Sequence, residues 1–181
     1  GYTGAGSAPD IGADEIANET NPPVIIYTQF PSSTCTTTDR TLTGVTITDA
    51  TGVPLSGGNR PRIYYRKNTG SWFSQPGTST GGTAQSSTWN FTIVVSDMGG
   101  VTGGDVVRYY IIAQDLMPTP NVGSNPSAGL VSSSVNSVTT PPTTPKTYTI
   151  LYTLNGTYTV GSGGNFTTIT AAVAAYNSAC S

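Results

Sequence analysis

The sequence contains no histidine and few charged residues, and both absences exclude kinds of chemistry. Without histidine, hydrolysis of the Ser-His type lacks its general base, and metal-dependent hydrolysis lacks its usual imidazole ligands. Charged residues make up 9% of the chain, against about 25% in an average soluble domain. The formal net charge of −2 provides no basic field for nucleic acid or anionic lipid. We therefore expect a non-enzymatic protein that has no nucleic-acid partner.

Long apolar runs are also missing. No segment approaches the ~20 apolar residues that cross a bilayer, so we expect no membrane span. The chain begins at Gly1 with neither a Met nor a signal h-region, which we interpret as a processed or excised piece. The two cysteines, Cys35 and Cys180, fall in different expected structural units and show no metal-binding spacing. We expect both thiols to be free within this chain or bonded to cysteines outside it.

Threonine, serine and glycine take the place of charge. Hydroxyl groups keep a surface solvated without charge, a composition typical of extracellular repeat proteins, so we expect a secreted, cell-surface location. Threonine and tyrosine favour strands, and the 22 glycines and 13 prolines supply turns. The composition therefore favours an all-β protein.

The chain divides into four parts. Residues 1–21 are Gly-rich and acidic and form an N-terminal arm or the end of a preceding unit. Residues 22–138 contain short strands with turn signals between them, which we place at residues 24–30, 40–48, 62–67, 89–96 and 105–115. This pattern predicts a β-sandwich. Residues 139–146 form a Thr/Pro linker, and residues 147–181 hold a strand and a short helix, which Thr168 or Thr170 could cap.

One strand carries a family resemblance. Residues 107–115, with Tyr109, Ile111 and Ala113 directed inward, resemble the sixth strand of fibronectin type III and related immunoglobulin-like folds, and residues 61–65 resemble the third. The likeness implies an immunoglobulin-like antiparallel β-sandwich with flanking β segments and one short C-terminal helix. It also implies that the Tyr109 hydroxyl bonds to a backbone group while its ring fills the core.

Both ends of the chain resemble parts of another fold. Residues 9–15 look like the closing coil of a right-handed parallel β-helix, and residues 158–169 are similar to the opening of one. Such regions occur in large bacterial surface proteins exported by the type IX route, some of them gliding adhesins. The resemblance implies a repeating fibre in which each unit buries its ends against a neighbour.

An aromatic and basic face is the first candidate site. If Ile63 and Tyr65 point inward, their neighbours point outward by the period of two, together with Ile112 and Gln114 of the adjacent strand. Tyrosine rings stack on sugars and arginines bind carboxylates, which favours an acidic polysaccharide; the alternative is that these side chains only cover the sheet. The candidate glycan-binding residues are Arg62, Tyr64, Arg66, Arg108 and Tyr110.

Carboxylates offer two further candidates. Asp97 and Asp105 flank a Gly-rich loop that could place oxygen ligands around calcium, although a plain strand connection explains the same residues. Asp10, Asp14 and Glu15 form the one sequence cluster of acids, with no Arg or Lys nearby. No catalytic residue is predicted, and calcium is the only cofactor that we consider.

Two functions follow. The first is a structural or adhesive repeat or spacer in a secreted surface fibre, with neighbouring copies or adjacent repeats as partners. The second is a carbohydrate-binding accessory module of a secreted polysaccharide-active protein. Residues 147–154 alternate cleanly outside the expected sandwich, so they could also add to a neighbour's sheet and form filaments. The candidate interface residues are Tyr148, Ile150, Tyr152, Leu154, Ile169, Val173 and Tyr176.

Overall fold

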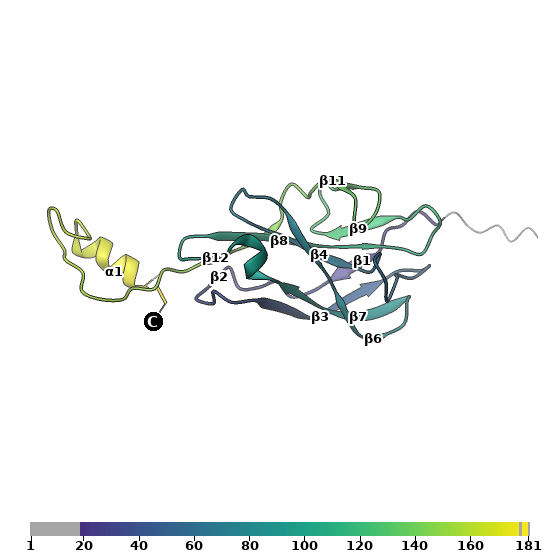
Figure 1. Cartoon of the computed structure of the whole chain (residues 1–181), viewed down its shortest axis with the longest axis horizontal. Coiled ribbons are helices and arrows are strands. Elements are labelled where there is room, and N and C mark those ends of the chain that lie inside the picture. The colour runs from purple at the N-terminus through teal and green to yellow at the C-terminus, as the bar shows by residue number, and fades with distance from the viewer. Residues whose placement is uncertain (1–18, 178, 181) are drawn as a thin grey trace, which may run out of the picture.

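The computed structural model describes residues 19–177, 179 and 180, which form a two-sheet β-sandwich with a C-terminal extension (Figure 1). The first sheet has the order β1 (Val24–Ile26), β3 (Arg40–Thr48), β7 (Ser86–Ile93) and β6 (Thr78–Gly82). The second has the order β2 (Ser33–Thr34), β12 (Lys146–Ile150), β8 (Val106–Gln114), β4 (Arg62–Lys67) and β5 (Phe73–Pro76), with β9 (Val122–Asn125) also paired to β8. The remaining elements are β10 (Val131–Ser132), β11 (Val138–Thr140), a 3-10 helix η1 (Val95–Met98) and the helix α1 (Ile169–Asn177).

The strand order confirms the predicted all-β sandwich. The order β1-β3-β7-β6 corresponds to the ABED sheet of an immunoglobulin-like sandwich, and β12-β8-β4 corresponds to its GFC sheet. The pairs within both sheets are antiparallel except β2 with β12, which is parallel. The antiparallel register places alternate side chains of each strand in the space between the sheets.

The main core lies between the two sheets and follows the predicted alternation. On β8, Tyr109, Ile111 and Ala113 are fully buried in it, and on β4 so are Ile63 and Tyr65. The facing strand β7 contributes Trp89, Phe91 and Ile93, which are also fully buried. These inward positions confirm the orientation that the sequence predicts for both strands of the second sheet.

Aromatic rings close one end of this core. The backbone N–H of Phe30 donates to the Tyr109 hydroxyl at 3.0 Å, which confirms that this hydroxyl bonds to a backbone group. The Phe30 ring meets the ring of Tyr148 edge-on at 5.5 Å between centroids. The Arg40 guanidinium lies 4.2 Å from the Phe30 centroid and 4.5 Å from that of Tyr148, within range of cation–π attraction. The cluster therefore ties the segment between β1 and β2 to β8 and β12.

A second cluster covers the outer face of β4 and β8. Tyr110, Ile112 and Val135 are fully buried there. The Tyr64 hydroxyl donates to the carbonyl oxygen of Val135 at 2.9 Å, and the Val135 N–H donates to Oε1 of Gln114 at 2.9 Å. The segment from β9 to β11 thus forms a third layer, so β8 is buried on both faces. Burial on both faces explains why its sequence reads as a nearly continuous apolar run.

The last strand of the sandwich corrects the predicted domain boundary. Residues 147–154 were expected to lie outside a sandwich that ends at residue 138, but β12 pairs with β8 on one side and β2 on the other. Tyr148 and Ile150 are buried in the main core. The expected linker also contains part of β11, which pairs with β10. The sandwich therefore extends to Ile150.

Other element boundaries agree in part. The bounds of β3 and β4 match the predicted strands, whereas β1 ends at Ile26 and β7 begins at Ser86. β6 lies between the predicted strands 62–67 and 89–96, where no strand was predicted. The predicted helix is present as α1, and the Ala171 N–H donates to the Thr168 hydroxyl at 3.1 Å, as expected for an N-cap. Among the described residues, no helix has the length and apolarity to cross a membrane.

Gly77 allows β5 and β6 to connect the two sheets. A Cβ at this position would lie 2.5 Å from the ring of Phe91, which is fully buried. We expect Gly77→Ala to lower the free energy of unfolding by about 1–3 kcal/mol because the core ring must move. Gly58→Ala is the matched control, since a Cβ there meets no atom within 4 Å. Chemical denaturation of both variants measures the difference, and equal losses would contradict the predicted contact.

Candidate functional site

The two strands of the predicted glycan platform are neighbours in the structure. The β4–β8 register pairs Arg66 with Arg108 and Tyr64 with Tyr110. The rings of Tyr64 and Tyr110 stack at 5.2 Å between centroids, with their planes 5° apart. The expected face therefore exists, on the side of the sheet away from the main core.

The third layer covers the centre of this face. Tyr110 and Ile112 are fully buried, and burial raises the pKa of Tyr110. Its hydroxyl lies beneath the covering segment with no hydrogen-bond partner, so it is not available to a sugar. The prediction that Tyr110 lies on an exposed binding face is therefore wrong, because residues 122–138 pack over it.

The arginines around this face contact the protein itself. The Arg66 guanidinium lies 4.6 Å from the centroid of the Trp72 ring. The Arg62 side chain donates to the Ser74 hydroxyl at 3.2 and 3.3 Å, and Arg108 Nη1 donates to the Asn68 carbonyl at 2.7 Å. These contacts agree with the alternative that the side chains cover the sheet.

The two carboxylates of the predicted calcium site, Asp97 and Asp105, accept hydrogen bonds from other groups of the protein. The Tyr65 hydroxyl and Nε2 of Gln75 both donate to Oδ2 of Asp97, the latter at 3.0 Å. Asn68 Nδ2 donates to Oδ1 of Asp105 at 2.8 Å, and the backbone N–H of Thr102 donates to Oδ2 at 2.8 Å. Asp97 therefore fastens η1 to β4 and β5, and Asp105 fastens its turn to the loop after β4.

The Tyr65–Asp97 bond gives a pH-dependent prediction. The bonds from Tyr65 and Gln75 lower the pKa of Asp97 below its ordinary value of 3.8. The stability that they provide is present above that value and is lost as pH falls through the lower, folded-state pKa. We expect Tyr65→Phe to raise the pKa of Asp97, measured by NMR titration of its carboxyl carbon. We also expect a stability loss at neutral pH that shrinks below about pH 4. A loss that is constant between pH 2 and 7 would contradict this linkage.

Three carboxylates from distant parts of the sequence meet near the start of β1. Ligand oxygens of Glu19, Asp49 and Asp115 all lie within 4.8 Å of one another. Asp115 is buried and accepts hydrogen bonds from Asn121 and from the Met117 backbone. Oε2 of Glu19 is buried and has no hydrogen-bond partner. Calcium prefers oxygen ligands such as those of carboxylates. These three acids, all in the described part of the chain, could therefore hold a cation.

Mutual repulsion of the three charges gives a second local prediction. Like charges 4–5 Å apart repel by about 1–4 kcal/mol, depending on how well water screens them. We expect Glu19→Gln to raise the free energy of unfolding by about 1 kcal/mol, because the amide removes one charge and can donate to a neighbouring carboxylate. Asp39→Asn is the control, since the one hydrogen bond described for Asp39 comes from the Val95 N–H at 2.8 Å. Thermal unfolding measures the stability of both variants. If Asp39→Asn raises the free energy of unfolding as much as Glu19→Gln does, repulsion among the three acids is not the cause.

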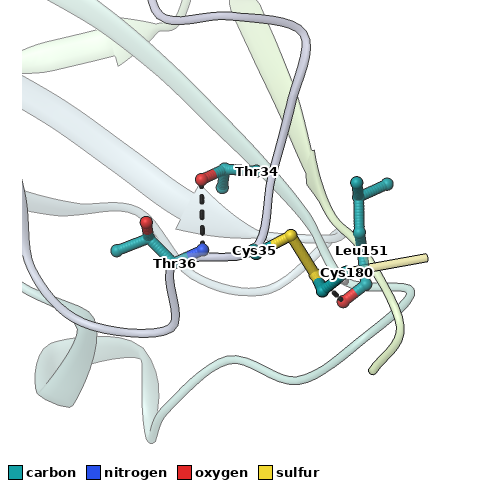
Figure 2. The surroundings of a disulfide bond; sticks show 5 residues. All are labelled: Thr34, Cys35, Thr36, Leu151 and Cys180. Carbon is teal, nitrogen blue, oxygen red and sulfur yellow. Dashed lines mark hydrogen bonds between the residues drawn. A yellow bond between two sulfur atoms is a disulfide. The ribbon is translucent and has the colours of Figure 1, made fainter. Parts of the chain in front are cut away.

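The two cysteines form a disulfide, so the prediction that they are unpaired within this chain is wrong. Their Cα atoms lie 5.5 Å apart although 145 positions separate them in sequence. Figure 2 shows the bond where the segment after β2 meets the chain beyond β12. The Leu151 N–H donates to the Thr34 carbonyl at 2.8 Å, and the Cys180 N–H donates to the Tyr152 carbonyl at 2.9 Å. Both cysteines therefore belong to one structural junction.

The C-terminal extension presents most of the other predicted interface residues. On α1, Ile169 is 74% exposed and Tyr176 is 70% exposed, and Val173 is also exposed. Tyr152 is exposed but packs on the Gly-rich turn before β8, where a Cβ at Gly103 would lie 2.7 Å from the Tyr152 Cα. Leu154, which is partly buried, lines a groove of about 600 Å3 together with residues at the C-terminal end of α1. Tyr148 and Ile150 are in the core, so they are not surface residues.

A groove beside β1 offers little chemistry. It has a volume of about 720 Å3 and lies between β1 and β9, lined by residues 21–25, 122–128 and 130. Its lining contains no charged side chain. The acids Asp10, Asp14 and Glu15 lie outside the described residues, as does the segment that resembles a closing β-helix coil. Comparisons with protein-family models, curated proteins and solved structures found no match.

Proposed function

We propose that the chain is a structural spacer of a secreted bacterial surface fibre, with adjacent repeats or further copies of itself as partners. One observation carries this proposal: the described chain starts at one end of the elongated sandwich, and the C-terminal extension projects from the opposite end (Figure 1). A unit with its connections at opposite ends adds length along one axis. The resemblance of both ends to β-helix segments and to proteins of the type IX route supports the same function.

The chemistry of the chain supports an extracellular location. Disulfides persist in oxidising compartments and are rare in the cytosol, and this chain places its two cysteines in one bond. All residues of β6 and the exposed positions of β3 and β7 are threonine, serine or glycine rather than charged residues. Such a surface remains hydrated without depending on salt concentration.

The exposed face of α1 supports a contact with an adjacent unit. Ile169, Val173 and Tyr176 follow the spacing of one helix face, yet α1 has no buried residue within the described chain. A helix of nine residues is too short to persist in water without packing. In the proposed fibre the adjacent unit covers this face.

The carbohydrate-binding alternative has less support. Its central ring, Tyr110, is buried, and its arginines contact Trp72, Ser74 and Asn68. A role as a spacer requires no ligand pocket and no catalytic residue.

Electron microscopy of the native material tests the proposal. Antibodies against this chain should label linear, regularly repeating structures on the cell surface, and surface protease treatment should remove the signal. Labelling confined to the cytosol, or to compact particles bound to polysaccharide, would overturn it.

A further inference from the structure

The disulfide divides the chain into a short linear part and a large closed loop. Cys35 follows β2 directly, and Cys180 lies beyond α1. Residues 36–179, from before β3 to after α1, are therefore enclosed by one covalent bond between sulfur atoms. All the described strands except β1 and β2 lie within this loop.

The bond sits where the chain leaves the sandwich. β2 lies parallel to β12, and the Thr149 N–H donates to the Ser32 carbonyl at 2.9 Å. Thr153 forms a parallel bridge with Cys180. The segment before Cys35, the exit of β12 and Cys180 therefore lie side by side at one end of the sandwich, as Figure 2 shows for the two cysteines and Leu151.

We infer that this disulfide makes the unit a link of nearly fixed length under tension. A force applied between the two ends of the chain passes along the residues before Cys35, through the S–S bond, and along the residues after Cys180. The covalent backbone of the enclosed residues lies outside this path and bears none of the force. Tension therefore cannot extend most of the sandwich into an unfolded chain. This inference rests on the proposed spacer function, in which tension acts along the chain.

The lengths involved differ by a large factor. An extended chain spans at most about 3.4 Å per residue, so the roughly 140 enclosed residues would release about 480 Å if the bond were absent. With the bond intact, only residues 19–35 of the described chain precede the link, and their full extension is at most about 60 Å. Part of that length is already used, because β1 and β2 are extended strands.

The linear part is itself held to the enclosed loop by several contacts. β1 pairs with β3 from Val24 to Ile26. Phe30 is buried and bonds to Tyr109, and the segment at β2 pairs with β12. Tension therefore first detaches β1 and the Phe30 segment, whereas the strands β3 to β8 stay closed behind the bond.

Single-molecule pulling tests the inference. The full chain is placed between reference domains of known extension and pulled through both ends, first oxidised and then in dithiothreitol. The reductant supplies two electrons and two protons to convert the disulfide into two thiols and becomes a cyclic disulfide itself. We expect extension of the oxidised unit to fall short of the reduced unit by about 480 Å. Mass spectrometry after alkylation establishes the state of both cysteines in each sample.

A variant with Cys35→Ser and Cys180→Ser gives a second measurement. It should show the long extension with and without dithiothreitol. If this variant fails to fold, the oxidised wild type still decides the question, because an unfolded chain with an intact bond remains about 480 Å shorter than one without it. Full extension of a chain shown to be oxidised would overturn the inference, as would equal extension of oxidised and reduced chains.

The result is separable from the proposed function. A short oxidised extension combined with the absence of surface fibres in microscopy would leave the fixed-length link intact and overturn the spacer role. Surface fibres combined with a long extension of the oxidised chain would leave the spacer role intact and overturn the fixed-length link.

Discussion

A chain that ends before Lys146 should not fold, whereas a chain that ends after Leu154 should. The first lacks β12, which contributes Tyr148 and Ile150 to the main core. Losing two large buried side chains costs about 5–10 kcal/mol, against a typical total stability of about 5–15 kcal/mol. Deleting β12 also removes the hydrogen-bond partner of β2 and of the part of β8 that pairs with β12.

The comparison requires a matched pair of chains. Both carry Cys35→Ser, because neither retains Cys180, so the absent disulfide affects them equally. Circular dichroism during heating and the dispersion of amide signals in NMR should show a cooperative fold only for the longer chain. If the shorter chain unfolds cooperatively with similar stability, residues 146–150 lie outside the sandwich, as the Thr/Pro-rich stretch before this segment first indicated.

The sequence predicts strands well where one face of the strand is buried and the other is polar. The bounds of β3 and β4 agree with those expected, because apolar and polar residues alternate along both. β6 was missed because its Thr, Ser and Gly residues are all exposed and leave no apolar period. β12 alternates clearly, but the Pro-rich stretch before it suggested a domain boundary rather than a crossing to the far side of β8.

The parts of the site that were missed depend on contacts between distant residues. Tyr110 is buried because Val135 and its neighbours pack over it, and those few apolar residues follow no regular spacing. Glu19, Asp49 and Asp115 meet only after three separate segments are folded. The pairing of Cys35 with Cys180 follows from the position of β12. Once the last strand is assigned to the wrong unit, the cysteines are separated as well.

Removing the disulfide should cause the second large effect. The bond closes a loop between positions 145 apart, and the chain-entropy model gives a stabilisation of about 5 kcal/mol for a loop of this size. We expect the variant with Cys35→Ser and Cys180→Ser to lose about 4–5 kcal/mol of unfolding free energy, measured by chemical denaturation under oxidising conditions. The fold should remain, because the aromatic core around Phe30, Tyr109 and Tyr148 does not include either cysteine.

The position of the disulfide predicts which segment becomes most accessible to protease when the bond is removed. In the native state it fastens the residues beyond Ile150, for which the one described backbone hydrogen bond to the sandwich runs from the Leu151 N–H to the Thr34 carbonyl. Limited proteolysis of the variant should therefore cut first between residues 153 and 180, while β12 stays protected by its pairing with β8. Wild-type protein treated with dithiothreitol is the control and should give the same first cut. A loss below about 1 kcal/mol with an unchanged cleavage pattern would mean that the bond contributes little in solution, since a loop of this size predicts several times more.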